Sequence, residues 1–332
     1  MSDVLCLGEI LVDWVCTTVG AELPESVQFT KAPGGAPANT AVGLARQGIK
    51  TGFIGRVSKD AFGEWLKAVL AENDIDVSMT IEDSQAQTRM AYVVTMANGD
   101  RKLAEFSRIA CADTRLREED LDNEQFTKAS ILHFGSISLI EEPAKSSTEK
   151  AVRLAKEKGM LASYDPNVRL SLWPSESACR DAILKTLHWG DIVKINEDEL
   201  QFLTGSRDHG EADRLRKENN IGLMIVTLDS RGAYISTANG CKIVPGFSVK
   251  LVEATGAGDG FNAGVLGGLL EHIKGASDRR AALDALSLDQ MLAIIHRANA
   301  IGALACTKPG AIPALPTKAE LDAFLTAQTV KS

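Results

Sequence analysis

The feature that most constrains the fold is a regular alternation of short apolar segments with longer amphipathic ones. The apolar segments have the length of strands, and most are followed by a segment with the residue spacing of a helix face. The expected strands are Val4–Gly8, Gly52–Gly55, Ile131–Phe134, Leu161–Tyr164, Ile192–Ile195 and Leu223–Thr227. Strands that alternate with helices form a parallel sheet covered on both faces. The sequence therefore predicts an α/β fold with a mostly parallel central sheet.

One segment interrupts this alternation. Arg89–Met96 and Lys102–Ser107 both have the composition of strands. Asn98-Gly99-Asp100 between them is typical of a hairpin turn. We interpret this hairpin as an inserted small sheet, which part of the turn-rich segment Asp13–Phe29 joins.

Composition and charge exclude several classes of protein. The 332 residues include 36 Lys and Arg and 44 Asp and Glu, which gives a net charge of −8. An acidic chain is a poor candidate for nucleic-acid binding, which usually needs a basic face. The longest apolar runs fall short of the roughly 18 residues of a membrane span, so none is expected. The 45% apolar and 24% charged residues are typical of a globular protein, and six scattered cysteines indicate reduced thiols in the cytoplasm.

The strongest chemical signal is the segment Glu253–Gly264, which contains four glycines. It follows a strand-like stretch, Val249–Val252, and leads into an expected helix. The N–H groups in the first turn of a helix are free and carry partial positive charge, so residues 256–258 predict an anion site. Asp259 beside that site is suited to act as a general base for a hydroxyl group. An acid at a helix start is also stabilised by the helix dipole, so the residues alone leave both interpretations open.

Three further segments place polar residues at the start of a helix or the end of a strand. Two glycines at positions 34 and 35 precede a helix, and Asn39 offers a donor and an acceptor to sugar hydroxyls. Asn196 and Glu199 follow an expected strand and are three positions apart on a helical turn, an arrangement that suits a hydrated Mg²⁺ ion. A helix cap with a solvated acidic run explains that pair equally well. Arg169 also follows a strand, where it is placed to meet a substrate phosphate.

Together these segments resemble the ribokinase-like carbohydrate kinases, also called the PfkB family. Two signature regions match, Gly34–Gly48 and Ala254–Gly268, and the resemblance covers nearly the whole chain. The segments most similar to the fructokinases of that family are Lys31–Asn39, His133–Ile140, Ser163–Ser175 and Ala303–Thr317. The resemblance implies a single three-layer α/β/α ribokinase-like domain over residues 1–332. It also implies a small β-sheet lid built from about residues 13–31 and 88–108.

The resemblance implies an activity and the residues that perform it. The activity is transfer of the γ-phosphate of ATP to the 6-hydroxyl of D-fructose, with Mg²⁺ and K⁺ as cofactors. The implied catalytic residues are Asp259 as the base and Gly256, Ala257 and Gly258 as the anion hole. The implied sugar-binding residues are Asp13, Gly34, Gly35, Asn39, Arg108 and Arg169. The implied nucleotide-binding residues are Lys194, Thr227, Gly232 and Asn299. Asn196 and Glu199 match the positions that organise Mg²⁺ through water, and Glu253 and Thr255 those of a monovalent cation.

Three positions depart from the family pattern. Glu253-Ala254 replaces the usual Asp-Thr, which puts activation by K⁺ in doubt. Asp229 stands where glycine is usual, near the expected nucleotide phosphates. Gly260 replaces serine or alanine, at little expected cost to the chemistry.

Two alternative functions stay open. One is another PfkB-type kinase, for 2-keto-3-deoxygluconate or ribose, because specificity depends on pocket contacts that the shared core does not reveal. The other is a sugar- or nucleotide-binding protein that has lost catalysis. The expected partners are a sugar and ATP, without nucleic acid or membrane, and the family resemblance adds a homodimer formed through the lid.

Overall fold

The core of the protein is a mostly parallel sheet, which confirms the α/β class. The structure is a computed structural model and describes residues 2–97 and 101–329, so the predicted turn Asn98-Gly99-Asp100 lies outside the described residues. The strands of this sheet are Val4–Leu7 (β1), Thr51–Ser58 (β4), Thr80–Asp83 (β5), Ile131–Gly135 (β8), Leu161–Asp165 (β9), Ile192–Asn196 (β10), Leu223–Thr227 (β11), Gly232–Thr237 (β12) and Gly240–Pro245 (β13). Their order is β13-β12-β11-β10-β9-β8-β1-β4-β5. β12 pairs antiparallel with both of its neighbours, and the other pairs are parallel.

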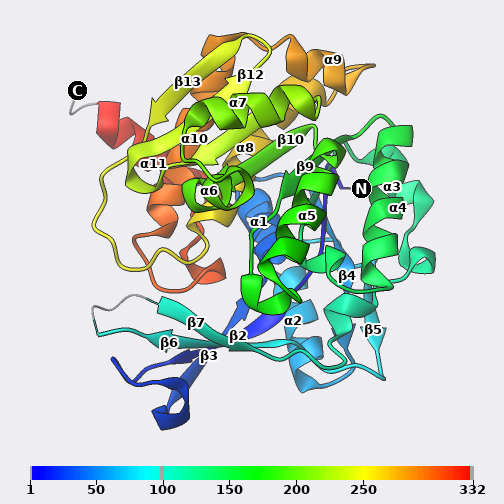
Figure 1. The fold of residues 1–332 in the computed structure, drawn as a ribbon, viewed down its shortest axis with the longest axis vertical. Helices are drawn as coiled ribbons and strands as arrows, with labels where there is room; N and C mark the ends of the chain where they lie inside the picture. Colours follow the sequence, from blue (N-terminus) through cyan, green and yellow to red (C-terminus); the bar gives the residue numbers. More distant parts are fainter. Residues whose placement is uncertain (1, 98–100, 330–332) are drawn as a thin grey trace.

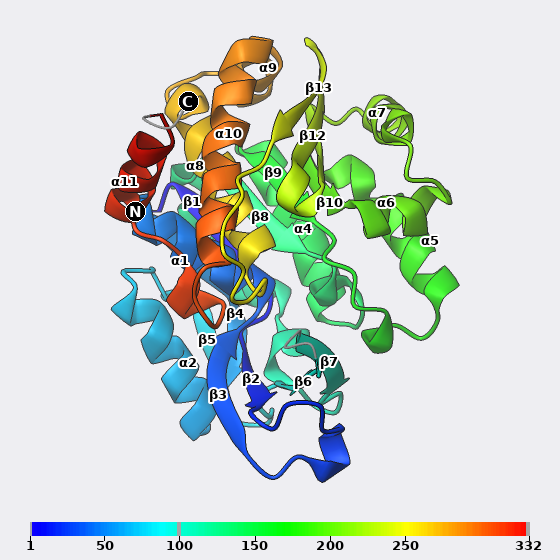
Figure 2. The same cartoon turned by 90° about the vertical axis from the view of Figure 1, so that its left-hand side faces the viewer.

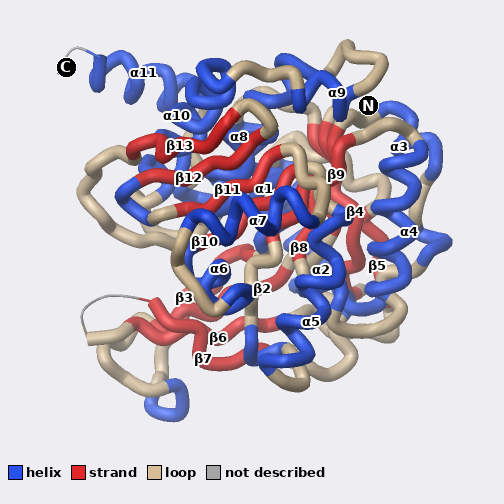
Figure 3. Tube along the Cα trace, turned by 45° about the horizontal axis from the view of Figure 1, so that its top comes forward, coloured by secondary structure: helices blue, strands red, loops and turns tan. Residues whose placement is uncertain are grey.

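Helices cover both faces of this sheet, in the three-layer arrangement that the family resemblance implies (Figures 2 and 3). One face packs against Ala36–Arg46 (α1), Ala61–Glu72 (α2), Ala257–Ile273 (α8), Arg279–Asp284 (α9) and Leu288–Ala305 (α10). The other face packs against Asn123–Lys128 (α3), Ala144–Glu157 (α4), Glu176–Thr186 (α5), Glu197–Thr204 (α6) and His209–Glu218 (α7). Lys318–Thr329 (α11) packs on the outside of α10. Because both faces are covered, strands such as β1 and β4 are buried along their whole length.

A second, small sheet lies beside the main body (Figure 1). Its strands are Leu11–Cys16 (β2), Phe29–Gly34 (β3), Met90–Thr95 (β6) and Arg101–Phe106 (β7), in the order β3-β2-β6-β7. Trp14 of β2 joins this sheet to α2, because its indole packs edge-on against Phe62 with the ring centroids 5.8 Å apart. The predicted hairpin strands therefore belong to this sheet, and the turn-rich segment contributes residues 13–16 of β2 and the first residue of β3.

The structure corrects the prediction for Val249–Val252, which form no strand. Leu251 and Val252 are 60% and 51% exposed, so apolar composition here does not reflect burial in a sheet. β5 was not expected, because its sequence, TIED, is mostly polar and lies on the sheet edge.

The start of α1 depends on two residues that the sequence singles out. Gly35 precedes the helix with φ of 109°, and Pro37 stands in the first turn, where its missing N–H costs no hydrogen bond. A Cβ on Gly35 would lie 2.4 Å from the carbonyl oxygen of Glu9. Only glycine therefore allows the chain to pass from β3 into α1 at this point.

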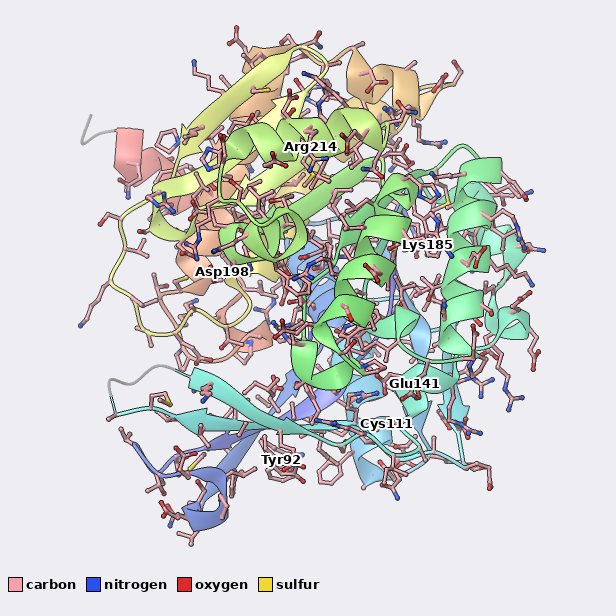
Figure 4. All side chains as sticks on the ribbon, viewed as in Figure 1. Tyr92, Cys111, Glu141, Lys185, Asp198 and Arg214 are labelled. Carbon is pink, nitrogen blue, oxygen red and sulfur yellow. The ribbon has the colours of Figure 1, made fainter. Side chains whose placement is uncertain are left out.

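The outer faces of the helices are charged. Figure 4 shows Lys185 on α5, Asp198 on α6 and Arg214 on α7 projecting away from the body of the protein. Within residues 2–97 and 101–329, none of the helices combines the length and the apolarity that crossing a membrane requires.

We predict that Gly264→Ala destabilises the fold by about 1–3 kcal/mol, since overpacking a closed interface forces the backbone to shift. A Cβ at position 264 of α8 would lie 2.6 Å from the Cα of Ala298 on α10. Urea unfolding measures the change. Gly275→Ala is the matched control, because a Cβ there meets nothing within 4 Å. Equal stability of the two variants would contradict the close packing of α8 on α10.

Candidate active site

The parallel strands bring Asp165 and two predicted site residues, Asn196 and Thr227, to one edge of the main sheet. Asp165 ends β9, Asn196 ends β10 and Thr227 ends β11, so all three lie at the carboxyl ends of adjacent strands. Ligands of open parallel sheets bind beyond this edge. The topology therefore defines the place where a substrate would bind before any side chain is considered.

A hydrogen bond joins the two glycine-rich segments at this edge. Nδ2 of Asn39 on α1 donates to Oδ2 of Asp259 on α8 at 2.8 Å, across 220 positions of sequence. Oδ1 of Asn39 is buried and has no partner among the described residues. A buried acceptor without a donor is costly unless a ligand or water supplies one. The pair thus combines a carboxylate held in place with a buried acceptor that lacks a donor among the described residues.

Burial makes Asp259 a weaker acid than an exposed aspartate. Removal from water raises the pKa of its carboxyl group to about 6, and the hydrogen bond from Asn39 opposes part of that rise. The Asp165 carboxylate raises the pKa further, whereas the Lys194 ammonium lowers it. A carboxylate with this pKa is ionised at neutral pH and more basic than usual, which suits a general base.

The residues of the predicted anion site lie at the N-cap and in the first turn of α8. Gly256 stands at the N-cap with φ of 82°, and a Cβ there would lie 2.9 Å from Cα of Ala311. The Ala257 amide donates to the carbonyl of Ala254 at 3.2 Å, so it is already engaged. The Gly258 amide belongs to the first turn, where N–H groups have no partner within the helix. Nζ of Lys194 lies close by, 3.2 Å from where a Cβ on Gly258 would stand.

Asp165 is a functional candidate that the sequence reasoning missed, although its position directly after an apolar strand was a signal. Its Oδ2 accepts hydrogen bonds from Nζ of Lys194 at 3.0 Å and from Nδ2 of Asn262 at 2.7 Å. Burial alone would lower the pKa of Lys194, but Asp165 and Glu199 more than offset this, so the pKa is raised. Lys194 is therefore a fixed positive charge beside the first turn of α8.

Asn196 and Glu199 form a reciprocal cap at the start of α6. Each side chain accepts the other residue's backbone N–H, at 2.8 and 2.9 Å, and Oε1 of Glu199 also accepts from the Val168 amide at 2.7 Å. Burial and the neighbouring Asp165 raise the pKa of Glu199, while Lys194 opposes the rise. Because both carboxylate oxygens already accept an N–H, this pair fits a magnesium ion held through water better than one bound directly.

The predicted sugar-binding residues on β2 and β3 lie in contact. A Cβ on Gly34 would lie 2.3 Å from Oδ2 of Asp13, so glycine makes room for that carboxylate. Burial raises the pKa of Asp13 to about 7, and the charge of Arg169 is the largest influence that opposes this. Arg169 also lowers the pKa of Asp259, so its charge acts on both acids. Arg108 is exposed in the loop after β7.

Glu9 is a second residue that sequence reasoning missed. It is a buried acid just after β1, and its Oε1 accepts the Ala36 amide at 3.0 Å. Burial raises its pKa to about 7. The carboxyl group supports the turn between β3 and α1, which holds Gly35 and Asn39 in position.

The residues predicted to bind nucleotide lie farther along the same edge. Thr227 ends β11, and Gly232 begins β12 with φ of 106° and the carbonyl oxygen of Val244 only 2.0 Å from a would-be Cβ. Asn299 of α10 is buried and donates to the carbonyls of Val244 and Pro245 at 3.2 and 3.1 Å. Gly232 therefore allows the close approach of β13 to β12, and Asn299 holds the end of β13 against α10. Asp229 is exposed, with φ of 51°, a conformation that favours glycine.

The two positions predicted for a monovalent cation differ in their surroundings. Glu253 is only 7% exposed, and its carboxylate is paired with Arg101 at the start of β7. Thr255 is exposed.

Comparison with known proteins finds the same family that the sequence motifs resemble, and the match covers nearly the whole chain. The family model described as pfkB family carbohydrate kinase matches residues 1–318. The chain is 40% identical to Fructokinase-1 of Zea mays over 320 residues, which are 96% of this chain and 96% of that protein.

Solved structures with a similar fold include fructokinases. The fructokinase with bound ATP from Xylella fastidiosa has a TM-score of 0.88 and 29% identity, covering 99% of this chain and 100% of that one. A double-mutant fructokinase from Vibrio cholerae, bound to fructose, ADP and a potassium ion, has a TM-score of 0.80 and 34% identity, covering 98% of each chain.

We predict that Asn39→Ala raises the pKa of Asp259 above its value of about 6. The amide donates to the ionised carboxylate, so its loss favours the protonated form. A carboxyl-carbon NMR titration measures the pKa directly. Asn73→Ala is the control, because that side chain bonds to the carbonyl of Val69 within its own helix. An unchanged Asp259 pKa in Asn39→Ala would show that the contact does not form in solution.

Proposed function

The chain belongs to the pfkB family of carbohydrate kinases, and we propose that it is an ATP-dependent fructokinase that phosphorylates the 6-hydroxyl of D-fructose. The observation that carries this proposal is the contact of Asn39 with Asp259 beside the start of α8. It places the carboxylate that we assign as the base beside the first turn of α8, and Oδ1 of the same Asn39 side chain has no hydrogen-bond partner among the described residues. The fructokinases that match over nearly their full length support the choice of sugar.

In the proposed reaction, Asp259 takes the proton of the sugar hydroxyl. The oxygen attacks the γ-phosphorus as the bond from that phosphorus to the bridging oxygen of ADP breaks. The donated proton ends on the Asp259 carboxyl group, and ADP leaves. A base with a pKa of about 6 is ionised at neutral pH and binds the proton better than an exposed aspartate does.

We assign the sugar and the nucleotide to opposite sides of Asp259. Asp13, Gly34 and Asn39 would hold the sugar hydroxyls, with Arg108 and Arg169 at the rim and the small sheet acting as a lid. The Gly258 amide and Lys194 would receive the γ-phosphate. Thr227, Gly232 and Asn299 shape the edge where the rest of the nucleotide would lie, and a relative with the same fold binds ATP.

Magnesium would be held at Asn196 and Glu199 through water. Such an ion supplies positive charge that offsets the negative charge of the phosphates. Within the chain itself, Lys194 provides a fixed positive charge, and Asp165 orients it toward the first turn of α8.

A panel of sugars tests the proposed substrate. With ATP and Mg²⁺, we expect kcat/KM to be highest for D-fructose among fructose, ribose, 2-keto-3-deoxygluconate and glucose. ADP release is measured for each sugar, and the phosphorylated position is identified by NMR of the product. If another sugar gives a higher kcat/KM, that sugar replaces fructose as the proposed substrate, and the protein is still a kinase of the pfkB family. Calorimetric sugar binding without ADP release would instead favour a binding protein.

Asp259→Asn is expected to lower kcat by about 10²–10⁴-fold, the usual contribution of a general base. The control is Asp289→Asn, which changes an exposed aspartate that also stands in a first helical turn, that of α10. It removes the same charge from a helix start without touching the site. Near wild-type turnover in a folded Asp259→Asn variant would contradict the assigned role.

A further inference from the structure

The carboxylate of Glu253 ties together three parts of the protein. One oxygen is paired with Nη1 of Arg101, the first residue of β7 in the small sheet. Oε2 accepts the backbone N–H of Gly310, in the loop after α10, at 2.7 Å. Glu253 itself lies three residues before the N-cap of α8. Figure 1 shows the start of β7 beneath these loops.

These contacts conflict with a monovalent cation at this position. A cation needs oxygen ligands with free lone pairs and little positive charge nearby. Here both oxygens of a buried carboxylate already accept hydrogen bonds, and one of the donors is a guanidinium group. Arginine keeps its charge at any pH that the fold survives. Glu253 and Thr255 therefore do not fit a monovalent cation such as potassium, which the Vibrio cholerae relative binds.

We propose that the Arg101 guanidinium takes the place of a monovalent cation, so that this kinase positions its anion site without K⁺. The proposal rests on the proposed phosphotransferase function. Arg101 is a positioning residue: its charge holds the Glu253 carboxylate, which holds the segment that leads into α8 against the loop after α10. The backbone contacts agree, since the amides of Val252 and Glu253 donate to the carbonyl of Cys306 at 2.8 and 3.2 Å.

The length of the acidic side chain is part of this arrangement. Glutamate at position 253 replaces the aspartate usual in the family, and the additional methylene extends the carboxylate from the loop toward β7. One oxygen can then reach the small sheet while the other keeps the bond to Gly310. The substitution that removes the usual ligand also makes the ion pair possible.

Loss of the Arg101 charge would leave a buried carboxylate without compensation. The segment before α8 would then shift, or the carboxylate would recruit a cation from solvent. Either event acts on the anion site through the backbone of residues 254–256. If Arg101 had only a structural role, loss of its charge would change the stability of the protein by the same amount in potassium and in sodium.

The experiment compares wild type with Arg101→Met, which removes the charge and keeps the bulk, and Arg101→Lys, which keeps the charge. Lys102→Met is the matched control, because it removes a positive charge from an exposed position next along β7. Rates are measured at constant ionic strength in about 100 mM potassium, sodium or choline chloride, where exposed charges are equally screened. Direct chromatography of ADP avoids a coupling enzyme with its own salt requirement. Thermal unfolding in the same three salts gives a readout that needs no activity.

For wild type, Arg101→Lys and Lys102→Met, we expect that neither kcat nor Tm of a given protein changes between the three salts. Arg101→Met should lose about tenfold or more in kcat in choline, as misplacement of a reacting group does. Potassium should restore part of this loss and raise the Tm of Arg101→Met alone.

Potassium stimulation of the wild-type enzyme would overturn the inference, as would an Arg101→Met variant with unchanged kcat. A loss of kcat in Arg101→Met that is the same in all three salts, with no effect of potassium on its Tm, would also overturn it. If wild type releases no ADP with any sugar, the proposed function fails, and the Tm comparison then decides the inference by itself.

Discussion

The hydrogen bond from Asn39 to Asp259 is the contact on which the candidate site depends. It requires α1 and α8 to begin close together, although α1 follows β3 of the small sheet and α8 follows the loop after β13. Gly35 and Gly256, both with positive φ, direct the chain into the two helices at this point. A side chain at either position would collide with neighbouring backbone, so the site and the glycine pattern have the same physical cause.

Charge compensation is the second constraint on this edge. Asp13, Asp165, Glu199, Glu253 and Asp259 all approach it in a chain that is acidic overall. Lys194, Arg169 and Arg101 each act on at least one of these carboxyl groups. Buried acids without such partners would take up protons or disrupt the fold. The net charge of −8 is thus compatible with a phosphate-binding site, because positive groups and helix amides are concentrated where they are needed.

Much of the fold could be predicted because parallel strands buried on both faces are short, apolar and followed by helices. β1, β8, β9, β10 and β11 were found within a residue or two for this reason. Val249–Val252 failed because apolar residues also occur in exposed loops, and β5 was missed because an edge strand can be polar. The small sheet was only partly foreseen, since its pairing of β2 with β6 joins distant segments and leaves no local pattern.

The sequence by itself determined most of the alternation of strands and helices in the main sheet, the two helix starts and the residue types that can act there. These features depend on local periodicity, on the positions of glycine and on the free amides of a first helical turn, all of which are local in sequence. Only the tertiary structure decided which groups face one another: Asp165 with Lys194, Glu199 with the Val168 amide, and Glu253 with Arg101. Those contacts join segments up to 152 positions apart, and the pairing of buried charges depends on distances in space that sequence spacing does not contain.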